Sequence, residues 1–156
     1  MHPRIAMVAV AAAAAVVIAG SGYTYYADVS AIRDSQVQLE NVRLTSLRLT
    51  QATLALQVTV DNPSGRDISD LTVSFDILLA DAFVGNGSFP ALSVPAHGQR
   101  TRDLNATVYF AQLSSAVVSA LQQGHFVVVL RGTVEGRVLL GLTTFSQSFS
   151  TSYVFS

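Results

Sequence analysis

The amino-acid sequence predicts an all-β fold with one short helix. The expected architecture is an immunoglobulin- or fibronectin-like antiparallel β-sandwich of about seven strands, preceded by an N-terminal transmembrane helix. Two observations predict the sandwich: apolar and polar residues alternate with a period of two in most segments after residue 36, and turns rich in Pro, Gly or Asn separate these segments. A third, a long apolar run at the start of the chain, predicts the N-terminal helix.

The N-terminal segment has a short positive start and an apolar continuation. Arg4 precedes an unbroken apolar run over residues 5–19. As a helix this run is about 22 Å long, shorter than the roughly 30 Å of a bilayer core, whereas adding residues 20–26 brings it to about 33 Å. The sequence therefore predicts that residues 5–26 contact a membrane. Three aromatic residues then lie where the membrane interface favours them: Tyr23, Tyr25 and Tyr26.

A cleaved signal peptide is the alternative interpretation of this segment. A signal peptide has a short positive start, an apolar centre and small residues near the cleavage point, which residues 19–22 supply. In both interpretations Arg4 stays in the cytoplasm and the chain after residue 27 lies outside it. The expected location is the cell membrane, with a single pass and the C-terminal domain outside the cytoplasm. After cleavage the protein would instead be secreted or periplasmic.

The predicted organisation has three parts: an anchor or signal segment at residues 1–27, a linker at residues 28–36 and a β-sandwich domain at residues 37–156. Within the domain, residues 37–50 change phase twice, which indicates one long strand with bulges or two short strands. Residues 126–134 are nearly all apolar, as in a central strand covered on both faces. The clearest alternating segments, typical of half-buried strands, are residues 53–61, 71–79, 104–110 and 145–155.

Turn residues mark the strand ends, and one segment has helical periodicity. Asn62-Pro63-Ser64-Gly65 ends a strand, because Pro63 has no backbone N–H to donate and Asn62 favours a turn. Further turns are predicted at residues 81–82 and 95–98. Apolar residues recur with helical spacing over residues 113–121, and Gly124 follows as a helix-terminating residue. One short helix is therefore expected to pack on the sandwich.

Charge and cysteine content exclude several classes of function. The nine basic residues, all arginine, and the ten acidic residues give a net charge of −1. No basic stripe is present, so nucleic acid is not expected as a partner. Because the chain has no cysteine, thiol catalysis, cysteine zinc sites and disulfides are excluded. The absence of lysine excludes a Schiff base and a P-loop.

The remaining candidates for chemistry are few. His97 lies in a predicted loop and His125 follows the predicted helix, so a loop role and a capping role are favoured over a shared metal site. Asp61, Asp67 and Asp70 flank one loop and could share Ca²⁺ with backbone carbonyls. Their spacing fits no calcium-loop signature, however, and each is a common turn residue. We therefore expect no enzyme activity, no catalytic residue, no metal or cofactor and no small-molecule substrate.

The order of the segments resembles a known domain. An alternating strand runs into Asn62-Pro63-Ser64, a strand with Phe75 leads to Val84-Gly85-Asn86-Gly87, and the helix before Gly124 precedes Leu139-Leu140-Gly141. This pattern is similar, over about residues 37–155, to the WHy domain (water stress and hypersensitive response) of the group-2 late embryogenesis abundant proteins. Its sharpest mark is an Asn-Pro-Asn strand end, in which serine replaces the second asparagine here.

The resemblance implies a non-enzymatic part in desiccation, cold or osmotic stress, in which the domain keeps client proteins from aggregating. It supplies no catalytic residue, and Asn62, Pro63 and Gly124 are expected to be structural positions. The alternative function is an extracytoplasmic protein- or lipid-binding scaffold module of an envelope assembly. A hydrolase, the third hypothesis, would need His97 or His125 to meet a serine and an aspartate.

Overall fold

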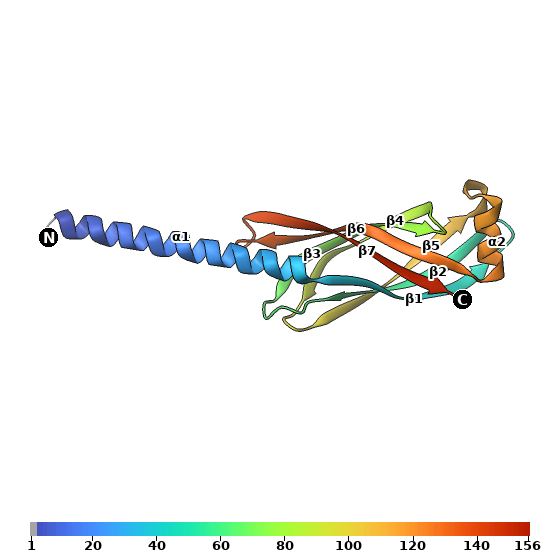
Figure 1. Cartoon of the computed structure of the whole chain (residues 1–156), viewed down its shortest axis with the longest axis horizontal. Helices are drawn as coiled ribbons and strands as arrows, with labels where there is room; N and C mark the ends of the chain where they lie inside the picture. Colours follow the sequence, from blue (N-terminus) through green and yellow to red (C-terminus); the bar gives the residue numbers. More distant parts are fainter. Residues whose placement is uncertain (1–2) are drawn as a thin grey trace.

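The computed structural model describes the backbone of residues 3–156 and the side chains of residues 14–156 (Figure 1). Within this range the strands form a two-layer sandwich; a long helix leaves one end and a short helix lies at the other. The elements are α1 (Pro3–Asp34), β1 (Gln36–Leu47), β2 (Gln51–Asp61), β3 (Ile68–Leu79), β4 (Ala82–Val94), β5 (Gln99–Tyr109), a 3₁₀ turn (Phe110–Gln112), α2 (Ser115–Gln123), β6 (Phe126–Val138) and β7 (Thr143–Phe155).

The strand order confirms the predicted antiparallel sandwich. One sheet has three strands in the order β1-β2-β5, and the other has four in the order β4-β3-β6-β7. All pairings between these neighbours are antiparallel. In an immunoglobulin constant-type domain the fourth strand joins the sheet of the first two. Here β4 instead lies at the edge of the opposite sheet, beside β3. The two sheets also meet at their edges, where the Leu39 N–H donates to Thr151 Oγ1 at 3.1 Å.

The core lies between the sheets, as the alternation predicts. Leu54, Leu56, Val58 and Val60 on β2 are at most 1% exposed, and they face buried residues of β3 and β6 across the sandwich. β1 is one long strand with two register shifts, between Leu39 and Asn41 and between Leu44 and Ser46, so the prediction of bulges is confirmed. Leu49 lies beyond the end of this strand and is almost fully exposed.

β6 corrects one expectation. It lies between β3 and β7, so it is central in its sheet, but only one of its faces is covered. Val127 is 38% exposed on the outer face, and Arg131 on the same face is also exposed. Within the described residues no third layer covers the outer face, and the β-branched residues there reflect the preference of such side chains for strands.

The turns and the short helix agree with the sequence patterns to within two residues. The β3–β4 turn is centred on Ala80 and Asp81, which have φ values of 45° and 67°, as in a type I′ hairpin turn. α2 begins after Ser114, whose side chain accepts the Val117 N–H at 3.4 Å. It ends at Gly124, which has a φ of 71°. Its Val117 and Leu121 are buried against the sandwich, so the predicted helix is confirmed.

The N-terminal helix is longer than predicted. α1 continues to Asp34, so residues 28–34, expected to lie in a linker, form its last turns. These residues include no Gly or Pro, and two of them, Ala31 and Ile32, are only 2% exposed because they pack on the sandwich. No helix within the described residues has both the length and the apolar character needed to cross a bilayer. The side chains of residues 5–13 of the predicted anchor lie outside the described residues, so the membrane span stays a prediction.

Candidate functional site

The most elaborate side-chain arrangement lies at the end of the sandwich where α1 joins it. The β2–β3 loop, the β4–β5 loop and the β6–β7 turn meet the last turns of α1 there (Figure 1). Several of these segments are far apart in the sequence. Polar contacts join them, and Asn62 and Asp28 take part in most of these contacts.

Asn62 is the centre of the two loops. Its side chain is 0% exposed, and its Nδ2 donates to the carbonyl oxygens of Arg66 at 2.7 Å, Pro95 at 3.1 Å and Val94 at 3.3 Å. Its Oδ1 accepts the Ser64 N–H at 3.1 Å and the Ser64 hydroxyl at 2.7 Å. Asparagine has both a donor and an acceptor end, so it satisfies its own β2–β3 turn and the start of the β4–β5 loop together.

Pro63 and Gly124, the other two positions predicted to be structural, make fewer contacts than Asn62. Pro63 is exposed in the β2–β3 loop, where it has no strand partner to bond. Gly124 ends α2 at the far end of the sandwich, and its N–H is directed at the Ala120 and Leu121 carbonyl oxygens. Ser64, which replaces the second asparagine of the motif, also donates its hydroxyl to the Arg66 carbonyl oxygen at 3.1 Å. Asn62, Pro63 and Ser64 thus shape one loop, and Gly124 is separate from it.

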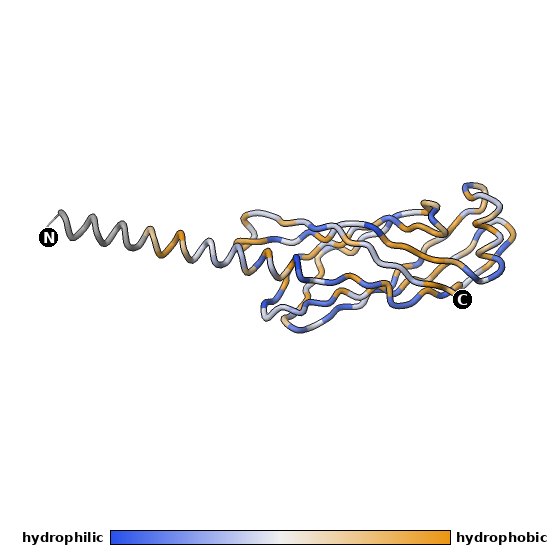
Figure 2. The backbone as a smooth tube through the Cα atoms, in the orientation of Figure 1, coloured by the Kyte–Doolittle hydropathy of each residue, from blue (hydrophilic) through white to orange (hydrophobic). Residues whose placement is uncertain are grey.

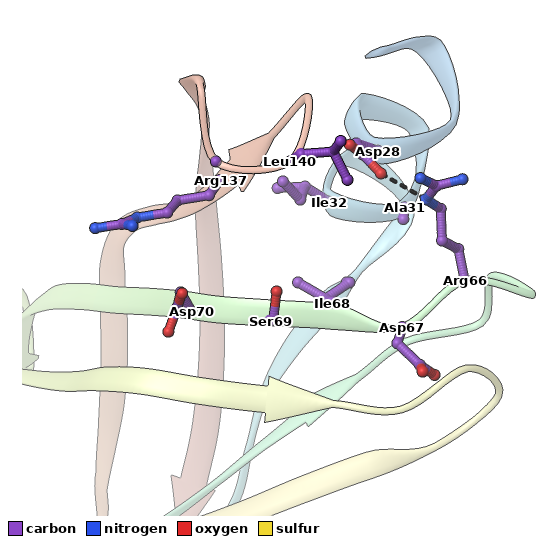
Figure 3. A pocket seen from close by; sticks show the side chains of 11 residues that line it. Asp28, Ala31, Ile32, Arg66, Asp67, Ile68, Ser69, Asp70, Arg137 and Leu140 are labelled. Atoms are coloured by element: carbon purple, nitrogen blue, oxygen red, sulfur yellow. Dashed lines mark ion pairs between the residues drawn. The ribbon is translucent and has the colours of Figure 1, made fainter. Parts of the chain in front are cut away.

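Asp28 joins α1 to two loops of the sandwich. One of its carboxylate oxygens forms an ion pair with Arg66 in the β2–β3 loop (Figure 3). The other accepts the Leu139 N–H, in the β6–β7 turn, at 2.9 Å. The Asp28 side chain is only 15% exposed, whereas the Arg66 side chain is 39% exposed, so the ion pair is shielded from water mainly on the Asp28 side. Asp28 therefore holds the helix in a defined direction relative to the sandwich.

Ile32 supplies the apolar part of the same junction. It packs on Gly136 of β6 so closely that a Cβ added to Gly136 would lie 2.5 Å from the Ile32 Cδ1. A side chain at residue 136 would therefore force the Ile32 side chain, or the helix that carries it, to shift. Ala31 and the half-buried Val29 complete the contact with the core. The sandwich is thus bonded and packed to the last turns of α1, which makes the helix a rigid continuation of the domain.

The substitution Ile32→Ala is expected to release these turns without unfolding the sandwich. Removing a buried isoleucine side chain costs about 2–4 kcal/mol. Amide hydrogen exchange at residues 28–35 should therefore become about 30-fold faster or more, while the β3 and β6 amides stay protected. The matched control is Ile18→Ala, because Ile18 lies on the same helix but is 72% exposed. Unchanged exchange at residues 28–35 in Ile32→Ala would contradict the docked junction.

A cavity of about 360 Å³ lies between α1, the start of β3 and the β6–β7 turn (Figure 3). Its lining residues include two acidic residues, Asp67 and Asp70, and two arginines, Arg66 and Arg137. Arg66 is already paired with Asp28, and the Asp67 Oδ1 accepts the Ala96 N–H at 2.7 Å. Charges of both signs are mixed along this wall, so it does not select a ligand of one charge.

The histidines and aspartates singled out in the sequence do not gather into a site. His97 lies in the β4–β5 loop at the α1 end, whereas His125 follows α2 at the opposite end. Asp61 ends β2 and Asp70 lies in β3, while Asp67 bonds the β4–β5 loop. Among the residues that the structure describes, no group of three or more His, Asp or Glu side chains is arranged to hold a metal ion.

Exposed apolar residues occur at both ends of the molecule, and those at the α1 end lie on the helix and in the β6–β7 turn. Along α1, Val16, Val17 and Ile18 are each 66–72% exposed, although consecutive helical residues point in different directions. The outer described part of the helix is coloured hydrophobic and stands clear of the sandwich (Figure 2). In the β6–β7 turn, Leu140 and Leu142 are 93% and 85% exposed. Both surfaces lack a cover within the described chain.

Sequence reasoning missed Asp28, Ile32 and the Leu140 turn as functional positions. Asp28 and Ile32 were assigned to a linker, because the apolar run had ended and no strand had begun. An Asp-x-x-Ala-Ile pattern spaced for one face of a helix was the available signal. Leu139-Leu140-Gly141 is part of the pattern described above, which predicts no function for this turn. Its signal is the placement of large apolar residues where a turn normally has polar ones.

Comparison with solved structures gives the fold context for this site. The protein AT1g01470 from Arabidopsis thaliana, studied in solution, superposes with a TM-score of 0.57 at 18% identity, over 76% of this chain and 78% of that one. This chain shares its fold. The Northeast Structural Genomics Consortium target SoR45 superposes with a TM-score of 0.50 at 10% identity, over 74% and 84% of the two chains.

A more distant likeness is to At2g46140.1, described as a "putative late embryogenesis abundant (LEA) protein". Its TM-score is 0.44 at 15% identity, over 92% of this chain and 84% of that one. No family model matches the sequence, and neither does any curated protein. At these identities the likeness concerns the fold alone.

Proposed function

We propose that this protein is a non-enzymatic stress-protection protein of the late embryogenesis abundant type, of the WHy kind. Residues 5–26 tether it to a membrane, and the β-sandwich lies outside the cytoplasm. There it acts in desiccation, osmotic or cold stress through weak contacts with client proteins or membrane surfaces. The observation that carries the proposal is the continuous α1: between residues 14 and 26 every side chain except that of Thr24 is exposed, and from Asp28 onward the helix is docked on the sandwich.

The exposed part of α1 supports the tether, because apolar side chains exposed on all sides of a helix are stable in lipid and unfavourable in water. The stress-protection part is supported by the sequence resemblance around Asn62-Pro63-Ser64, and the fold shared with AT1g01470 agrees with the sandwich that this resemblance implies. A non-enzymatic role is consistent with the positions of His97 and His125 at opposite ends of the sandwich, where neither can assist the other.

Drying a labile reporter enzyme with the domain tests this proposal. The fragment should begin at Ala27, so that Asp28 and Ile32 keep the junction intact. We expect the reporter to retain more activity at equal molar amounts of domain than with an unrelated, inert β-sandwich of the same size. The reason is that weak, broad contacts keep partly unfolded clients apart. Protection no better than that of the inert sandwich would refute the stress-protection role.

A further inference from the structure

The β6–β7 turn, residues 139–142, combines two features that a solvent-exposed turn normally avoids. Leu139 and Leu140 have φ values of 53° and 56°, in the left-handed region that Gly, Asn and Asp occupy at low cost. Leu140 and Leu142 are also 93% and 85% exposed to solvent. Both features disfavour leucine: the left-handed φ strains its backbone, and the exposure places its apolar side chain in water. Strained, exposed apolar residues that persist in a fold point to a functional contact.

The turn is held beside α1 at a defined position along the helix axis. The Leu139 N–H donates to Asp28 Oδ2 at 2.9 Å, so the turn cannot drift along the helix. Figure 1 shows that the β6–β7 hairpin runs beside α1 and reaches further toward the N-terminus than the other loops at that end. Tyr26 precedes Asp28 by about 3 Å along the helix axis, and Tyr23 by about 7.5 Å. The leucines therefore lie within two helical turns of the exposed tyrosines.

We infer that this turn is a second membrane contact, in which Leu140 and Leu142 enter the interface of the bilayer that α1 crosses. The inference rests on the proposed membrane tether. The tyrosines mark the depth at which aromatic side chains favour the membrane interface, and the turn reaches the same depth. Arg137, exposed on the adjacent strand, suits this position because its aliphatic stem can lie over apolar surface while its guanidinium stays in water.

A bilayer fits the turn better than a charged partner does. Asp67, Asp70, Arg66 and Arg137 mix both charges around it, so neither an acidic nor a basic surface is selected. Insertion should therefore occur in zwitterionic phosphatidylcholine and depend little on salt. Two contacts, the helix and the turn, would fix the rotation of the sandwich about the helix axis. The loops at the α1 end would then face the lipid, and α2 would face away from it.

Single tryptophan probes test this arrangement, because the natural chain has no tryptophan. Leu142→Trp places the probe in the turn, and Leu140→Trp is a second probe of the same surface. The matched control is Leu49→Trp, at a residue 97% exposed in the β1–β2 turn, at the opposite end of the sandwich. The full chain would be reconstituted into phosphatidylcholine vesicles with and without brominated acyl chains. Resistance to carbonate extraction and the intact mass would report whether the anchor is inserted and uncleaved.

We expect the emission of Leu142→Trp and Leu140→Trp to shift to shorter wavelength and to lose about half its intensity to brominated chains, as for a residue several ångströms below the headgroups. Leu49→Trp should stay unquenched. A chain that resists extraction but leaves both turn probes unquenched would overturn the second contact and keep the tether. Blue-shifted, unquenched turn probes would indicate a protein cover instead. Quenching of all three probes would overturn the proposed orientation, because the sandwich would then lie flat on the bilayer. A chain lost on extraction would overturn the tether as well.

Discussion

Gly132→Ala is expected to prevent the four-stranded sheet from forming. Gly132 lies in β6 opposite Phe75 of β3, and an added Cβ would lie 1.8 Å from the Ser74 carbonyl oxygen and 2.6 Å from the Phe75 Cα. Both of these are backbone atoms of the neighbouring strand, so no side-chain rotation can relieve the clash. β3 and β6 would have to separate at the centre of the sheet, where each has a partner on both sides.

We expect Gly132→Ala to lower the free energy of unfolding by about 4 kcal/mol or more, which would leave little folded protein. The measurement is thermal unfolding of the full chain in detergent, followed by circular dichroism. Gly85→Ala is the matched control, because Gly85 is also in this sheet and an added Cβ there meets nothing within 4 Å. If both variants melt within a few degrees of the natural chain, the close approach of β3 and β6 described above is incorrect.

Asn62→Ala is expected to have the next largest effect. Its side chain donates to three carbonyl oxygens and accepts two hydrogen bonds, all in a place where Asn62 itself is fully buried. Alanine removes all five of these hydrogen bonds, although the Pro95 carbonyl oxygen still accepts the Gly98 N–H at 3.0 Å, and each lost hydrogen bond costs about 0.5–1.5 kcal/mol. A total loss of about 3–5 kcal/mol follows, because the β2–β3 and β4–β5 loops lose their common centre.

Urea unfolding of the full chain in detergent measures this loss. Asn105→Ala serves as the control, because Asn105 is exposed on β5 and takes part in no side-chain hydrogen bond among the described residues. Asn62→Asp should be as harmful as alanine, since it replaces a donor by an anion directed at three carbonyl oxygens. If Asn62→Asp unfolded at the same urea concentration as the natural chain, the donor role of Nδ2 would be disproved.

Patterns within short stretches of sequence determined most of the strands and α2. The alternation of Leu54, Leu56, Val58 and Val60 identified both β2 and its buried face, because side chains on a strand point to opposite faces with a period of two. The helical spacing before Gly124 identified α2 in the same way. The Asn62-Pro63 strand end was also visible, since the turn preference of Asn and the missing N–H of Pro are properties of the residues themselves.

The tertiary structure alone decided how these elements combine. The side chain of Asp28 bonds a residue 111 positions later in the chain, and that of Asn62 bonds one 33 positions later; local periodicity carries no information about such pairs. The sheet to which β4 belongs, and the close approach that requires glycine at residue 132, also depend on which strands become neighbours. Residues 28–34 are the clearest example. Their sequence permits a helix or a linker, and the packing of Ile32 on Gly136 selects the helix because burial there outweighs the freedom of an unattached segment.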